Sequence, residues 1–174
     1  RERGSGEQGR LCHRYIFELD DALVHDIDMI TRLELLNNAG KELDRLIESC
    51  PGDADRNYDR SVCHKKIGDL LRIKGDTAGM LTEDRSAMAI AEQWLVVNPS
   101  NAGWWHALST SHHKIGDVFI MQGNLTEALT CYQATHEILE RLQAADPFNP
   151  NLKRDLLVNH KKIGDVLLEK GELS

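Results

Sequence analysis

The chain has 174 residues, of which 21 are Lys or Arg and 28 are Asp or Glu, so its formal charge is −7. Hydrophobic residues make up 41% of it, which excludes a disordered chain and allows a buried core. The negative charge disfavours binding to nucleic-acid backbones, because such binding needs clustered cations. Few aromatic residues (5%) and only 4 prolines favour helices over a β-sandwich.

Neither a signal peptide nor a membrane span is indicated. Residues 1–10 contain no apolar segment, and no apolar run approaches the roughly 20 residues that a membrane helix needs. We therefore expect a flexible segment over 1–10 and a soluble, cytoplasmic chain without membrane contact. The four cysteines, Cys12, Cys50, Cys63 and Cys131, form no CxxC pair, so we expect reduced thiols that pack as small apolar residues.

An internal repeat of 48 residues organises the chain. Its markers are the Ile-Gly-Asp triplets 67–69, 115–117 and 163–165, the prolines at 51, 99 and 147, the glycines at 75, 123 and 171, the histidines at 64, 112 and 160, and the lysines at 66, 114 and 162. Apolar positions three and four apart, punctuated by these glycines and prolines, predict two helices in each repeat.

In chain order, the pattern predicts helices over 11–26, 30–49, 54–74, 78–97, 102–122, 125–145 and 150–170. The first two form a degenerate pair within 11–53, in which Asp20 replaces the repeated glycine. Complete repeats follow over 54–101 and 102–149. The segment 150–174 contains the first helix of a further, truncated repeat.

Residues 115–132 and the proline after them carry a familiar pattern. Its markers are Gly116, Phe119, Gly123, Ala128, Tyr132 and Pro147. These residues resemble the tetratricopeptide repeat (TPR), a helix-turn-helix unit of about 34 residues. The roughly 14 extra residues of each unit fit as about two additional turns on each helix. The resemblance covers 50–174 and implies an all-α, right-handed superhelix (an α-solenoid).

The long repeat form also resembles repeat regions of bacterial signalling proteins. Within the degenerate first pair, the segment 15–22 is similar to segments that open such regions downstream of some bacterial serine/threonine kinase domains.

The glycines of the three triplets lie inside predicted helices, where glycine costs about 1 kcal/mol relative to alanine. No phosphate-binding glycine motif surrounds them, so we expect each to mark the close approach of a neighbouring helix. The histidines at 64, 112 and 160 lie on successive helices and cannot converge on one metal. We expect them to pack between the two helices of each unit.

A second possible metal site consists of His106, His113 and Asp117 on one helix face. The alternative is an ordinary ion pair between His113 and Asp117, matching Lys65–Asp69 and Lys161–Asp165 in the other repeats. We predict no metal, no cofactor and no catalytic residue, since the serines of the helix 102–122 do not face its histidines and no nucleophile can be assembled with a base.

The TPR resemblance implies a concave groove lined by the first helix of each unit. Its predicted residues are Tyr58, Lys65, Asp69, Arg72, Ile73, His106, His113, Asp117, Ile120, Met121, Arg154, Lys161, Asp165 and Leu168, with Val62, Thr110 and Val158 in the same stripes. An alternative is that their charged pairs only keep this face soluble. Some TPR proteins bind a terminal carboxylate where the present repeats have Asp69, Asp117 and Asp165. Because carboxylates repel, we expect an internal ligand segment with apolar anchors and one or two cations.

The sequence thus predicts a non-catalytic protein–protein interaction scaffold that binds a peptide or protein segment in this groove, without nucleic acid. Two alternatives stay open: a regulatory repeat segment of a larger bacterial signalling enzyme such as a serine/threonine kinase, and a self-assembly module. Self-assembly would use the helix at 150–170, on which we expect Leu156, Ile163, Val166 and Leu167 to be exposed.

Overall fold

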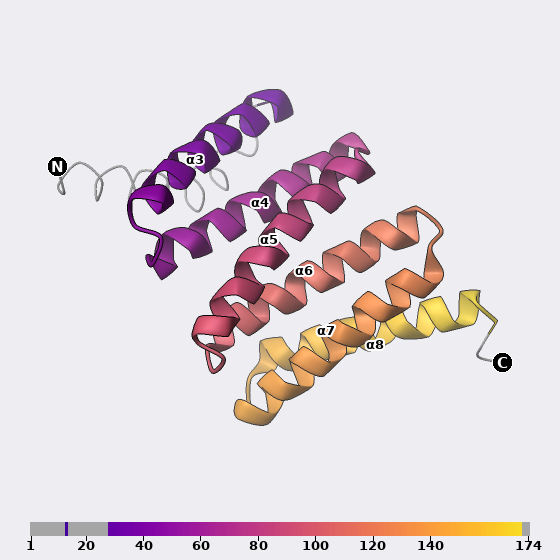
Figure 1. Cartoon of the computed structure of the whole chain (residues 1–174). Helices are drawn as coiled ribbons and strands as arrows, with labels where there is room; N and C mark the ends of the chain where they lie inside the picture. Colours follow the sequence, from indigo (N-terminus) through magenta and orange to yellow (C-terminus); the bar gives the residue numbers. More distant parts are fainter. Residues whose placement is uncertain (1–12, 14–27, 172–174) are drawn as a thin grey trace. The chain divides into compact units, whose positions relative to one another are not determined.

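The computed structural model describes residue 13 and residues 28–171. The described residues form an all-α structure of six helices of 20 or 21 residues, packed sequentially in antiparallel pairs (Figure 1). They are α3 (Met29–Ser49), α4 (Ala54–Lys74), α5 (Thr77–Val97), α6 (Ala102–Met121), α7 (Leu125–Ala145) and α8 (Pro150–Glu169). Each lies within one residue of its predicted bounds. The segment expected at 1–10, most of the helix expected at 11–26, the kinase-like segment 15–22 and residues 172–174 lie outside the described residues.

Short polar side chains begin these helices and glycines end three of them. The carboxylates of Asp28 and Asp53 and the amide of Asn101 accept hydrogen bonds from the first free backbone N–H groups of α3, α4 and α6. After α4, α6 and α8, Gly75, Gly123 and Gly171 adopt φ values of 78°, 75° and 73°, a conformation that glycine reaches without steric cost. The polar and glycine residues between the helices therefore determine where these helices begin and end.

The chain divides into two compact units, with the boundary inside α5 after Ile90. In the first unit, α3 and α4 enclose a core that contains Leu36, Leu43, Cys63, Ile67 and Leu70. At its rim, the guanidinium of Arg60 donates two hydrogen bonds, of 2.7 and 3.0 Å, to the carboxylate of Asp44. On the other side of α4, the imidazole of His64 lies 2.6 Å from the carboxylate of Glu83 on α5. Apolar burial and charged pairs thus join consecutive helices.

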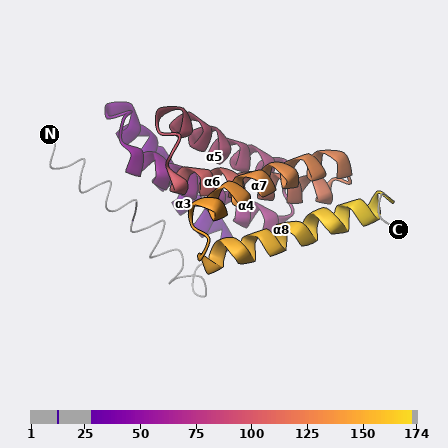
Figure 2. The same cartoon turned by 90° about the horizontal axis from the view of Figure 1, so that it is seen from below.

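In the second unit, α7 packs against both α6 and α8, as the view from below shows (Figure 2). Its central core cluster contains Ala128, Leu129 and the fully buried Tyr132 of α7 together with Val166 of α8. At the start of α6, the ring of Trp104 stacks on Trp94 with a centroid distance of 5.9 Å. The aromatic position predicted from the repeat therefore lies at the centre of this unit.

The triplet glycines mark a close helix contact most clearly in one repeat. A Cβ atom at Gly116 would lie 2.7 Å from Cε1 of Tyr132, so only glycine fits under this ring. At Gly68 the nearest atom is Oδ1 of Asp84, at 3.4 Å, because Asp84 stands where the aromatic ring would be. At Gly164 no described atom lies within 4 Å. The predicted close approach is confirmed at Gly116, is looser at Gly68, and is not seen at Gly164.

Two further predictions concern exposure. Cys63 is buried in the core of the first unit, as expected for a small apolar residue, whereas Cys50 is exposed at the end of α3. The expected exposure of the apolar face of α8 is wrong, because that face packs against α7. Leu156 and Val166 are 7% and 2% exposed, and Ile163 and Leu167 are partly buried against the core cluster around Tyr132. Across the described helices, none has a segment long and apolar enough to cross a bilayer.

Candidate functional site

A cleft of about 440 Å³ lies within the second unit, between α6 and α8. It is lined by His106, Ser109, Thr110, His113 and Lys114 of α6, by Thr135 and Leu139 of α7, and by Asn151, Arg154, Asp155 and Val158 of α8. Five of these residues, His106, Thr110, His113, Arg154 and Val158, belong to the two groove stripes predicted from the sequence. The structure brings these five residues, the N-terminal parts of the two stripes, together on the two walls of one cleft.

The floor of the cleft comes from α7. Thr135 and Leu139 are both buried, and the hydroxyl of Thr135 donates to the backbone oxygen of Cys131 at 3.0 Å. On the α6 wall, the hydroxyls of Ser109 and Thr110 each donate to the backbone oxygen of His106 at 2.9 Å. These hydroxyl protons are therefore bonded to main-chain carbonyls rather than to an imidazole base.

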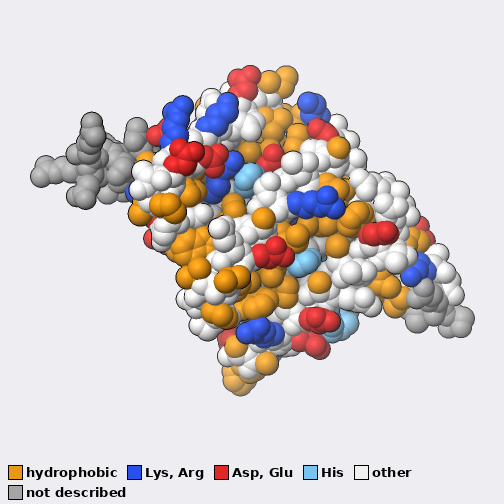
Figure 3. Space-filling view, viewed as in Figure 1, with side chains coloured by type: hydrophobic (Ala, Val, Ile, Leu, Met, Phe, Trp, Pro, Cys, Tyr) orange, Lys and Arg blue, Asp and Glu red, His pale blue; other side chains and the backbone are white. Residues whose placement is uncertain are grey.

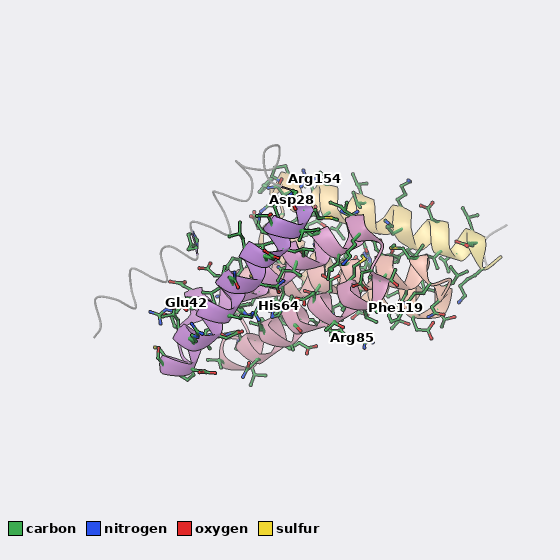
Figure 4. All side chains as sticks on the ribbon, turned by 90° about the horizontal axis from the view of Figure 1, so that it is seen from above. Asp28, Glu42, His64, Arg85, Phe119 and Arg154 are labelled. Atoms are coloured by element: carbon green, nitrogen blue, oxygen red, sulfur yellow. The ribbon has the colours of Figure 1, made fainter. Side chains whose placement is uncertain are left out.

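The charged residues of the cleft sit mainly on its α8 wall. Nε of Arg154 lies 3.7 Å from the carboxylate of Asp155, and Nε2 of His106 lies 3.5 Å from the same carboxylate, across the cleft. The Arg154 side chain is 71% exposed and lies near the beginning of α8 (Figure 4). Lys114 adds a second cation to the lining. The lining thus holds two permanent cations and one carboxylate.

Asp117 does not line this cleft, although the sequence placed it in the groove. Its Oδ1 accepts hydrogen bonds of 2.7 Å from the hydroxyl of Tyr132 on α7 and from Nζ of Lys162 on α8. The predicted partner His113 is farther away, with Nε2 at 3.9 Å from Oδ2. Burial raises the pKa of Asp117, but the bonds from Lys162 and Tyr132 outweigh it and hold the pKa below its ordinary value of 3.8.

Tyr132 is the second member of this group. Burial, together with the hydrogen bond to the carboxylate of Asp117, raises the pKa of its hydroxyl. The backbone oxygen of Tyr132 accepts a hydrogen bond of 2.9 Å from Nδ2 of Asn159, a fully buried side chain of α8. Asp117, Tyr132, Asn159 and Lys162 therefore tie α6, α7 and α8 together beside the cleft.

The remaining predicted site residues of the second unit lie elsewhere. Ile120 packs against the core cluster around Tyr132, while Met121 and Leu168 are exposed. Lys161 and Asp165 form their expected i, i+4 pair at 3.9 Å, with both side chains mostly exposed on α8. These five positions do not line the cleft.

The predicted residues of α4 belong to the first unit, whereas the cleft belongs wholly to the second. They are Tyr58, Lys65, Asp69, Arg72 and Ile73, and among them Nη2 of Arg72 lies 3.9 Å from the carboxylate of Asp69. Tyr58 and Ile73 are exposed. Their part in a longer groove stays a prediction.

Several residues that line the cleft were not predicted from the sequence. Asp155, Asn151 and the α7 residues Thr135 and Leu139 lie outside the predicted stripes, because stripes drawn on single helices omit the floor between them. Lys162 was detectable, since it belongs to the lysines repeated every 48 residues with Lys66 and Lys114. The predicted groove contains its neighbour Lys161 instead.

The histidines do not form a metal site within the described residues. No group of three His, Cys, Asp or Glu side chains converges there as ligands. Of the repeated histidines, His64 packs between α4 and α5, as predicted. His160 contacts His136 of the preceding α7, with ring centroids 4.6 Å apart. Burial lowers the pKa of His112 on α6.

The sequence was compared with models of known protein families and with curated proteins, and neither comparison gave a match. The cleft is therefore interpreted from its own geometry and chemistry.

Proposed function

We propose that this chain is a non-catalytic protein–protein interaction scaffold, and that the cleft between α6 and α8 binds a peptide segment of a partner protein. The observation that supports this most directly is the cleft itself. Its two walls carry predicted groove residues, and apolar Leu139 and Val158 lie in it beside charged and hydroxyl groups. Apolar contacts with a few oriented polar groups are typical of ligand sites.

The contacts within the cleft also support binding rather than catalysis. A nucleophilic hydroxyl needs a base within hydrogen-bond reach. The hydroxyls of Ser109 and Thr110 instead donate to the backbone oxygen of His106, and its imidazole faces Asp155. In this arrangement neither hydroxyl is bonded to a base that could activate it.

The wider proposal is that the repeats stack as a right-handed TPR-like superhelix within a cytoplasmic signalling protein of a bacterium. The 48-residue register and the sequential antiparallel packing support this proposal. On the face seen in Figure 3, basic and acidic side chains are interspersed with hydrophobic ones, a mixture that suits protein contacts better than a phosphate backbone.

A matched pair of threonine substitutions tests the cleft. Thr110 lines it, whereas Thr130 lies exposed on α7, and both hydroxyls donate to the carbonyl four residues earlier. The probe is an array of N-acetylated, C-amidated dodecapeptides of varied sequence, with the strongest binders then titrated by fluorescence anisotropy. Thr110→Tyr should fill the cleft and weaken binding by about tenfold or more, and Thr130→Tyr should leave it unchanged. The proposal fails if no peptide binds the parent chain, or if both variants lose binding equally.

Self-assembly is a second candidate, favoured by a different observation. Leu157 and Leu168 on α8 are 71% and 60% exposed, eleven residues apart and so on one helix face. Exposed apolar side chains that share a face can pair with a second copy. This exposed face of Leu157 and Leu168 differs from the face of α8 that the sequence predicts for self-association, most of which packs on α7.

A further inference from the structure

We infer that the α6–α8 cleft selects its peptide through an acidic side chain bound by Arg154, with a neighbouring apolar side chain on Leu139 and Val158. This inference rests on the proposed function and names the chemistry of its ligand. It reverses the cationic ligand expected from the sequence.

The first observation concerns the carboxylates in and beside the cleft. The sequence favours a cationic ligand because it predicts Asp69, Asp117 and Asp165 in the groove, but none of the three lines the cleft. In the structure, Asp117 lies outside the lining and accepts short hydrogen bonds from Tyr132 and Lys162, so its charge is compensated within the protein. The one carboxylate of the lining, Asp155, lies near both Arg154 and His106 and is not reserved for Arg154. The permanent positive charge of Arg154 therefore favours an anionic ligand group.

The geometry of Arg154 carries the second step. Among the described residues, its ionic contact is a long one, 3.7 Å from Nε to the carboxylate of Asp155, and its side chain is 71% exposed. Asp155 also faces His106 at 3.5 Å and is therefore shared between two partners. A guanidinium held this loosely can offer two parallel N–H groups to a ligand carboxylate, the geometry in which arginine binds carboxylates best.

The neighbours of Arg154 carry the third step. Val158 lies one helical turn after Arg154 and lines the same wall, and Leu139 lies on the floor. Side chains one turn apart on a helix are about 5–6 Å apart. An extended ligand spans nearly that distance with alternate residues, since two residues rise about 6.6–6.8 Å. The ligand should therefore carry its acidic and apolar side chains two positions apart.

Two blocked peptide pools test this ligand class. Both are fluorescein-labelled, N-acetylated and C-amidated, with randomised flanks; one contains Glu-X-Leu and the other Gln-X-Leu. The Glu pool should bind the parent chain about tenfold tighter than the Gln pool. Arg154→Gln should remove that advantage without weakening the Gln pool. Lys153→Gln is the matched control, because it removes the same charge from the adjacent exposed residue, which does not line the cleft.

A charge reversal adds a gain of binding that a misfolded variant cannot imitate. Arg154→Glu should lose the Glu pool and gain binding to a Lys-X-Leu pool. Succinate added as a competitor separates a peptide from a small carboxylic acid, and millimolar succinate should leave the Glu-X-Leu pool bound.

The outcomes separate this inference from the proposed function. If no pool binds the parent chain, the peptide cleft itself is refuted. If the Gln or Lys pool binds as tightly as the Glu pool, or if Lys153→Gln acts like Arg154→Gln, the cleft stands but the acidic ligand is wrong. Displacement of the Glu pool by equimolar succinate would likewise overturn the assignment to a peptide.

Discussion

The two glycines Gly116 and Gly164 occupy the same repeat position in different surroundings, so the same substitution should have opposite effects. A Cβ at Gly116 would lie 2.7 Å from Cε1 and 3.0 Å from Cδ1 of Tyr132. The ring cannot swing away easily, because Tyr132 is fully buried and its hydroxyl is bonded to Asp117. At Gly164 a Cβ would meet no described atom within 4 Å.

The magnitudes follow from two opposing terms. Alanine in a helix is favoured over glycine by about 1 kcal/mol at both positions. Overpacking a rigid core typically costs about 1–3 kcal/mol, and this cost applies only at Gly116. Gly116→Ala should therefore lower the free energy of unfolding by up to about 2 kcal/mol. Gly164→Ala should raise it by up to about 1 kcal/mol.

Urea unfolding followed by tryptophan fluorescence measures this difference in the right part of the chain. All three tryptophans, Trp94, Trp104 and Trp105, lie in the second unit with both glycines. The reasoning is refuted if Gly116→Ala is stabilised like Gly164→Ala. A double-mutant cycle sharpens the test: in a Tyr132→Leu background the ring is gone, so Gly116→Ala should no longer destabilise.

Three further predictions concern titration, thiol reactivity and association. Because folding lowers the pKa of Asp117, its charged form stabilises the fold at pH values above the ordinary pKa of 3.8, and this stabilisation is lost as the pH falls below 3.8. Asp117→Asn should therefore make the free energy of unfolding, measured by urea titration, fall less steeply as the pH is lowered through this range. Burial raises the pKa of Cys63 to about 11, so iodoacetamide at pH 8 should alkylate exposed Cys50 rapidly and Cys63 only after unfolding, as peptide mass mapping would show. If α8 mediates self-association, Leu157→Glu should abolish concentration-dependent light scattering, and a parent chain that stays monomeric at millimolar concentration contradicts this.

The helix bounds were predictable because particular residue types mark the ends of helices. Residues such as Gly75 and Gly123 stop a helix through a conformation that other residues reach at a cost, and Pro99 and Pro147 cannot continue one. These signals are local and repeat at a fixed period. They place each helix bound within one residue without any knowledge of how the helices pack.

Exposure and pairing were less predictable, because they depend on packing between helices. Leu156 and Val166 were expected to be bare, since α8 was considered without the second face of α7. Lys162 rather than Lys161 bonds to Asp117, because the rotation of α8 against α6 decides which lysine faces inward. A difference of one residue turns a side chain by about 100° around a helix, and sequence periodicity alone does not fix that angle.

The chemistry of the cleft follows from the repeat together with this rotation. Positions 58, 106 and 154 are equivalent in the 48-residue register, and they hold Tyr58, His106 and Arg154. In the second unit, His106 and Arg154 line opposite walls of one cleft, with Asp155 between them. The 2.7 Å bond from Lys162 to Asp117 joins the same two helices directly and keeps that carboxylate out of the lining. One ion pair therefore ties the two walls together and leaves Asp155 as the carboxylate of the lining. The residue at a single repeat position, here arginine, then decides the charge of the ligand.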